Sequence, residues 1–144
     1  MKSLDTNILV YASNEDAPEY GKARKLIASL IDGPQDWIIA DQVLIETYRA
    51  LRNPAVIQHP LAASDAWALV HFYREEAGCR RCCYELGTWR HLQKYLNSAR
   101  FDPRKTFDAI LAVTLLSNAV DTFYTRNTKD FKQFGFRTLN NPID

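Results

Sequence analysis

Apolar segments typical of short β-strands alternate with amphipathic segments along this chain, and this alternation limits the fold more than any other feature. The apolar spacing predicts helices over residues 17–32, 41–52, 61–77, 89–99 and 107–118. Strands are predicted at residues 2–5, 37–40, 81–84, 122–125 and 137–139. Parallel strands need helical crossovers, so the alternation predicts an α/β fold with a central, mostly parallel sheet flanked by helices. Because the length fits one domain, we expect residues 1–144 to form a single unit.

The composition excludes several classes of protein. A formal net charge of +1 provides no overall positive field to hold a polyanion, so any contact with nucleic acid must be local. No apolar run reaches the roughly 18 residues that cross a bilayer, so we expect a cytoplasmic protein with no membrane contact. Cys79, Cys82 and Cys83 lie too close together to link distant segments, so we expect free thiols. A zinc site that includes His91 is the alternative, but only half of a paired ligand set is visible.

Acidic and amide side chains recur at the ends of the expected strands or in the first turns of the following helices. The set comprises Asp5, Glu46, Asp108, Asn127 and Asp130. Ligands of parallel sheets bind at the carboxyl ends of the strands, so we expect these residues to share one edge. Carboxylates that converge raise one another's pKa unless a cation neutralises them. Oxygen ligands without His or Cys favour Mg²⁺ or Mn²⁺.

Each acid also has a purely structural interpretation. Asp5 can cap the turn that follows it, Asp108 can complement its helix dipole, and Glu46 can pair with Arg49 one turn later. The joint placement of the acids favours a shared site. Asp108 is the strongest single case, because a charge beside the apolar sequence of a central helix needs a partner.

Four segments, spread over nearly the whole chain, resemble the motifs of the PIN-domain ribonucleases. They are LDTNILV at residues 4–10, LIE at 44–46, FDAILA at 107–112 and YTRNTKDF at 124–131. The chain length and the ending at residues 136–142 are similar to those of the VapC-type toxins of bacterial and archaeal toxin-antitoxin pairs.

This resemblance implies an endoribonuclease that hydrolyses RNA phosphodiester bonds with Mg²⁺ or Mn²⁺, is neutralised by a cognate antitoxin protein, and forms a homodimer. Asp5, Glu46 and Asp108 match the acidic positions of the family, and Thr125 matches its small hydroxyl residue. Many relatives carry an acid where this chain has Asn127. Either Asn127 or Asp130 therefore completes the acidic set.

Polar residues beside the acids are expected to contact the RNA. They are Thr6, Asn7, Arg104, Lys105, Thr125 and Arg126. An equally open interpretation is that the basic members are solvated loop charges. If the chain is a toxin, the expected antitoxin surfaces are the helix around Tyr20 and Lys25 and the helices that carry Tyr48 and Trp67.

Three other functions remain as alternatives. The first is a PIN-type nuclease for RNA processing that has no antitoxin. The second is a signalling module of the receiver type, although its phosphate-accepting Asp and late Lys are absent from suitable positions. The third is an RNA-binding or scaffold domain without catalysis, which would bind RNA but not cleave it.

Overall fold

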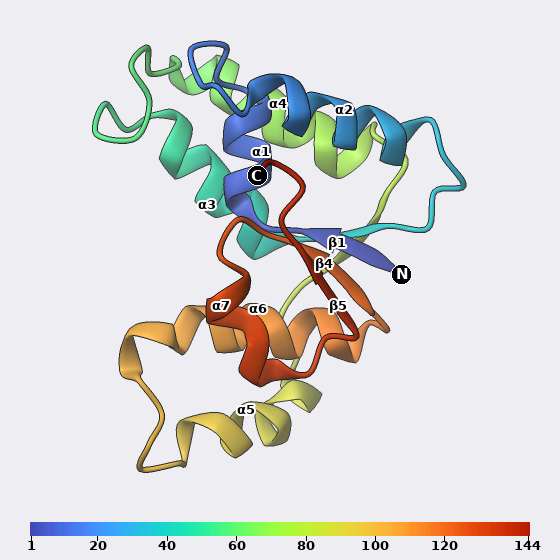
Figure 1. Ribbon diagram of the computed structural model, residues 1–144, viewed down its shortest axis with the longest axis vertical. Helices are drawn as coiled ribbons and strands as arrows, with labels where there is room; N and C mark the ends of the chain where they lie inside the picture. The colour runs from blue at the N-terminus through green and yellow to red at the C-terminus, as the bar shows by residue number, and fades with distance from the viewer.

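A computed structural model describes all 144 residues and contains five strands and seven α-helices (Figure 1). The strands are β1 (Lys2–Leu4), β2 (Ile38–Ala40), β3 (Arg80–Cys82), β4 (Thr122–Tyr124) and β5 (Thr138–Asn140). The helices are α1 (Thr6–Ala12), α2 (Tyr20–Ile31), α3 (Asp41–Leu51), α4 (Ala63–Glu75), α5 (Trp89–Leu96), α6 (Thr106–Ser117) and α7 (Thr128–Phe131). Short 3₁₀ turns lie at Leu86–Thr88, Pro103–Lys105 and Lys132–Phe134.

All the strand pairs are parallel, but the sheet is built in two parts. One part has the order β1-β4-β5 and the other pairs β2 with β3. A parallel bridge between Lys2 and Trp37 joins them, and the Ser3 hydroxyl donates a hydrogen bond to the Ile38 carbonyl at 2.7 Å. The predicted parallel sheet is thus present, with its middle held by few backbone contacts.

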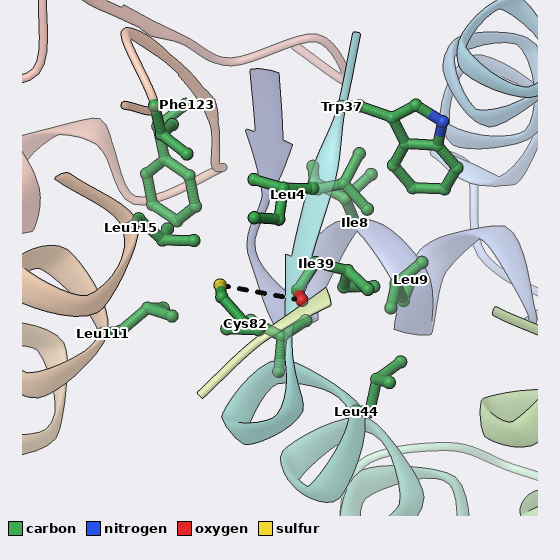
Figure 2. Packing of buried hydrophobic residues seen from close by; sticks show 14 of the residues in the cluster. Leu4, Ile8, Leu9, Trp37, Ile39, Leu44, Cys82, Leu111, Leu115 and Phe123 are labelled. Carbon is green, nitrogen blue, oxygen red and sulfur yellow. Dashed lines mark hydrogen bonds between the residues drawn. The ribbon is translucent and has the colours of Figure 1, made fainter. Parts of the chain in front are cut away.

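Helices cover both faces of the sheet. Figure 1 shows α1 to α4 on one side and α5 to α7 on the other. In Figure 2, Leu111 of α6 packs on one side of Leu4, and Ile8 of α1 packs on the other. Residues 111–115 of α6 are all buried, as its apolar sequence predicted. The backbone at the start of this helix is therefore positioned by the packing of its buried residues.

The pairing of β1 with β4 determines where the chain's polar side chains emerge. Leu4 lies opposite Tyr124, and the Asp5 amide donates a hydrogen bond to the Tyr124 carbonyl at 2.9 Å. Asp5 and Thr125, the residues that follow these two strands, therefore leave the sheet side by side. Asp5 then serves as the N-cap of α1, because its side chain accepts a hydrogen bond from the Thr6 amide.

Several element boundaries differ from the sequence prediction. Helices α1 and α7 were not predicted, because seven and four residues are too few to show a helical period. Helix α2 begins at Tyr20, because residues 14–19 form hydrogen-bonded turns. Helix α5 ends at Leu96, three residues early. No helix in the structure has the length and apolar character that spanning a membrane requires.

The three cysteines form no disulfide. The Cys82 thiol is buried and points to the Ile39 carbonyl at 3.8 Å (Figure 2). Burial raises the pKa of Cys79 to about 11 and that of Cys82 to about 12, so both stay protonated at neutral pH. His91, the residue considered for a zinc site, lies beside Ser117 of α6.

Candidate active site

A cavity of about 390 Å³ opens at the carboxyl ends of β1 and β4. All five predicted acidic and amide residues line it. The full lining is Asp5, Thr6, Asn7, Val10, Tyr11, Asn14, Glu46, Ala50, Val56, Asp108, Asn127, Asp130 and Phe131. Residues from four distant parts of the sequence therefore meet at one edge of the sheet.

Asp5 lies at the bottom of the cavity and is held by three hydrogen bonds. The Thr6 amide donates to Oδ1 at 2.8 Å, and the Asn7 amide nitrogen and the Thr125 hydroxyl donate to Oδ2 at 2.9 and 2.7 Å. Asp5 is only 8% exposed, so burial raises the pKa of its carboxyl group while these hydrogen bonds oppose the rise. Asn7 and Thr125, which we expected to contact RNA, both position this carboxylate.

Glu46 reaches the cavity from α3 and is oriented by two donors. The Thr6 hydroxyl donates to Oε2 at 3.0 Å, and Gln42 Nε2 donates to Oε1 at 3.2 Å. The same nitrogen of Gln42 donates to the Phe107 carbonyl at 3.0 Å. Gln42 was not among the predicted site residues, although it lies four residues before Glu46 on the same helix face, a spacing at which side chains interact. The alternative interpretation, an ion pair between Glu46 and Arg49, is not seen in the structure, because Glu46 bonds to Thr6 and Gln42.

Asp108 lies in the first turn of α6 and accepts no hydrogen bond within the chain, although it lines the cavity. Burial raises the pKa of its carboxyl group to about 6, and the carboxylates of Asp5 and Asp130 contribute to the rise. An ionised Asp108 therefore has a free energy cost that an external positive charge would relieve.

Asn127 and Asp130 both reach the cavity from the segment after β4. The Asn127 amide donates to the Thr125 hydroxyl at 3.0 Å, and the Asp130 amide donates to the Asn127 carbonyl. Asp130 accepts a hydrogen bond from Lys105 Nζ. Both residues lie where the sequence predicted, and the geometry leaves open which one completes the acidic set.

The basic residues expected to bind RNA each pair with an acid of the same chain. Lys105 bonds to Asp130, and the exposed Arg104 forms an ion pair with Asp102 at 3.0 Å. Arg126 contacts Glu19 at 3.2 Å and donates a hydrogen bond to the Tyr11 hydroxyl. These side chains are therefore partly neutralised, and a phosphate must compete with an internal carboxylate for them.

The donor set has the chemistry of a site for a hard divalent cation. The cavity presents carboxylate, amide and hydroxyl oxygens, and no His, Cys, Lys or Arg lines it. As the side chains stand, no three acids lie close enough together to hold one ion. A shared ion therefore requires side chains to rotate, and Asp108 is able to do so without losing a hydrogen bond.

The sequence pattern of the PIN domain matches residues 3–137. The chain belongs to the PIN domain family. This PIN-domain chain is 36% identical over 145 residues to Ribonuclease VapC24 of Mycobacterium tuberculosis, and the match covers 99% of the chain and 97% of that relative. It is also 24% identical over 144 residues to the VapC ribonuclease Mb2897 of Mycobacterium bovis, a match that covers the whole chain and 97% of that relative. The resemblance inferred from the four sequence motifs is thereby confirmed.

Solved structures share the PIN fold of this chain. VapC20 of Mycobacterium tuberculosis, described as a sarcin-ricin loop cleaving toxin, superposes with a TM-score of 0.71 at 18% identity, covering 94% of this chain and 96% of that one. VapBC2 of Rickettsia felis, bound to a promoter DNA fragment, gives a TM-score of 0.63 at 19% identity, with 97% of both chains covered. At these identities, the two structures support the fold of the PIN domain alone.

Proposed function

We propose that this PIN-domain chain is an endoribonuclease of the VapC type that hydrolyses RNA phosphodiester bonds with the help of Mg²⁺ or Mn²⁺. The observation that carries the proposal is Asp108, an unpartnered carboxylate that shares one cavity with Asp5 and Glu46. The similarity of the chain to Ribonuclease VapC24 supports the choice of RNA as substrate. The cation would be held by Asp5, Glu46 and Asp108, with Asn127 or Asp130 completing the set.

A bound divalent cation supplies an activated water molecule and stabilises negative charge on the phosphoryl oxygens. The chain itself supplies the geometry. Three hydrogen bonds fix Asp5, and Thr6 and Gln42 orient Glu46. Because Asp108 accepts no hydrogen bond within the chain, its negative charge is available inside the cavity.

The proposal is tested by incubating purified protein with structured RNA in the presence of Mg²⁺, Mn²⁺ or a chelator. We expect cleavage with either metal and none with the chelator. Asp5→Asn and Asp108→Asn should each reduce cleavage at least about 100-fold, because each removes a charge needed for metal binding. Asp65→Asn is the matched control, since Asp65 is a first-turn acid of α4 outside the cavity.

Thermal unfolding separates loss of metal binding from loss of folding. A cation that binds only the native state raises the melting temperature. We expect Mg²⁺ to raise it for the wild type and for Asp65→Asn, but not for Asp108→Asn. Cleavage that persists in chelator, or an equal Mg²⁺ response in all three proteins, would contradict the metal proposal.

We also propose that an antitoxin protein neutralises the nuclease, that the chain forms homodimers, and that it acts in the cytoplasm. Solved relatives of the fold include the VapBC2 and FitAB assemblies, which supports a protein partner. The helices predicted to meet it are α2, α3 and α4. Of these, α3 and α4 form an apolar cleft of about 1020 Å³ lined by Tyr48 and Trp67, and Trp67 is 62% exposed.

Expression in a bacterial host tests this second proposal. We expect growth arrest that is relieved by co-expressing the neighbouring open reading frame, and sedimentation of the purified chain at the mass of a dimer. Harmless expression with retained nuclease activity would instead favour an RNA-processing enzyme without an antitoxin.

A further inference from the structure

The active-site cavity extends well beyond the acids, along the groove between α1 and α3. These two helices pack side by side (Figure 1). Asn7 and Tyr11 lie four residues apart on one face of α1, Asn14 follows two residues after the end of this helix, and all three line the cavity. Seven residues of helix correspond to about 10 Å, so this wall leads away from Asp5 toward Asn14.

The part of the cavity away from the acids is lined by uncharged, partly apolar side chains. Its walls are Val10, Tyr11, Asn14, Ala50 and Val56. None of these side chains carries a charge, and Arg126, which contacts Tyr11, is already paired with Glu19. This half of the cavity therefore suits a flat, neutral group attached to a charged one that lies at the acids.

The exposed wall of this region is held in place by the loop after α3. The Asn53 carbonyl accepts hydrogen bonds from the amides of Val56 and Ile57 at 2.9 and 3.1 Å. Ile57 is buried, whereas Val56 is 50% exposed at the cavity mouth. The buried neighbour anchors the turn, so the exposed apolar side chain is presented in a fixed position.

Tyr11 is also fixed, in a way that leaves its ring available. The Arg126 guanidinium lies over the ring, 5.1 Å from its centre, and donates to the hydroxyl. Glu19 pairs with the same guanidinium, which partly neutralises it. One face of the ring is therefore covered by a paired cation, while the ring still lines the cavity.

Asn14 provides a polar atom at the outer end of the groove. Its Oδ1 accepts a hydrogen bond from the Asp16 amide at 3.3 Å, which orients the side chain. Its Nδ2 donates no hydrogen bond within the chain, although the residue lines the cavity. A donor with no partner in an apolar groove favours a ligand that presents a carbonyl or ring nitrogen acceptor.

We propose that the groove formed by Val10, Tyr11, Asn14, Ala50 and Val56 binds a nucleobase next to the scissile phosphate of the RNA. This inference rests on the proposed function, because the phosphate is taken to lie at the acids. The Tyr11 ring contacts the base by stacking, as in other sites for single-stranded nucleic acid. Asn14 Nδ2 donates to an acceptor on the base edge and so favours some bases over others.

The experiment measures base preference at the cut. Purified protein cleaves a pool of random RNA in Mg²⁺, and sequencing of the new ends gives the preferred bases on both sides of the scissile bond. Single oligonucleotides then carry each base, or an abasic residue, at the position with the stronger preference. The variants are Tyr11→Leu, Tyr11→Phe and Asn14→Ala, with Asn97→Ala on the exposed end of α5 as the control.

We expect Tyr11→Leu to lower kcat/KM about 10-fold for all four bases, which is the size of one lost base stack. Tyr11→Phe should retain most of the activity, because it keeps the ring. Asn14→Ala should reduce the discrimination between bases, and Asn97→Ala should behave as the wild type. On the abasic substrate, wild type and Tyr11→Leu should become equal.

The outcomes separate the two proposals. Suppose that the wild type cleaves with metal, that Asn14→Ala keeps the wild-type base preference, and that Tyr11→Leu is as defective on the abasic substrate as on the others. These results together overturn the nucleobase site but not the proposed function. If the Tyr11→Leu and Asn14→Ala variants keep the wild-type base preference but are no longer inhibited by the antitoxin, the groove binds the protein partner. That result also overturns the nucleobase site. A wild type that cleaves no RNA overturns the proposed function and this site with it. Melting temperatures confirm that each variant is folded.

Discussion

At the scale of single residues, Asp108 combines a structural cost with a chemical use. Its carboxyl pKa of about 6 in the folded protein lies above the ordinary value of an aspartic acid, 3.8. The folded state therefore binds the proton more tightly than the unfolded state does. Stability from this group is fully present below the unfolded pKa and is lost as pH rises through about 6.

This difference predicts the effect of Asp108→Asn on folding without metal. In chelator at pH 7.5, the substitution should raise the free energy of unfolding by about 1 kcal/mol, because the neutral amide avoids the cost of a partly buried charge. At pH 4 the advantage should disappear, since wild-type Asp108 is then largely neutral. Urea unfolding at the two pH values measures this. Equal stability at pH 7.5, or a gain only at pH 4, would show that the carboxylate is not destabilised.

The contrast between Asp5 and Arg126 shows what single residues reveal in the sequence. Asp5 was selected correctly as part of the cavity, because the end of a parallel strand fixes where its side chain emerges. Arg126 was expected to contact RNA, but its side chain turns to Glu19 and Tyr11. Whether the Arg126 side chain faces solvent, substrate or an internal acid depends on Tyr11 and Glu19, which lie more than a hundred positions away in the sequence. No local sequence pattern contains this information.

At the scale of elements, the start of α6 depends on its connection to α3. Gln42 links the two by bonding both Glu46 and the Phe107 carbonyl. We predict that Gln42→Leu lowers kcat about 10-fold, because two acids on different helices lose their common support. The free energy of unfolding should change by less than about 1 kcal/mol, because the lost bonds are partly exposed.

Single-turnover cleavage assays and urea unfolding test this prediction together. Gln93→Leu is the control, because Gln93 is an exposed residue of α5 away from the acids. Wild-type cleavage by Gln42→Leu would show that the link does not position the acids. A large loss of stability would show that its role is mainly structural.

The five strands and the longer helices were predictable from the sequence, but the two shortest helices were not. Helix α6 was recognised because its apolar sequence is too long for a strand and too continuous for a surface helix. Helix α7 was not predicted, yet it places Asp130 in the cavity. The division of the sheet into two parts was also missed, because strands of three residues give no information about which neighbour they pair with.

At the scale of the whole molecule, the near-zero net charge limits how RNA is held. The chain carries a formal net charge of +1, and Arg104, Lys105 and Arg126 already pair with internal acids. If about three phosphates are contacted, log kcat/KM should fall with log salt with a slope of about −2, at roughly 0.7 per phosphate on a single strand. Cleavage assays between 50 and 200 mM NaCl, roughly the range over which such slopes are measured, provide the test. A slope of about −5 or steeper would reveal a larger basic surface.

The pairing of β1 with β4 also determines when a newly made chain can assemble its cavity. Asp5 leaves the ribosome among the first residues, but Thr125, which holds its carboxylate, is among the last. A nascent chain has no β4 beside β1 and hence no assembled pocket. The carboxylate of Asp5 therefore acquires its full set of hydrogen-bond donors only when synthesis is almost finished.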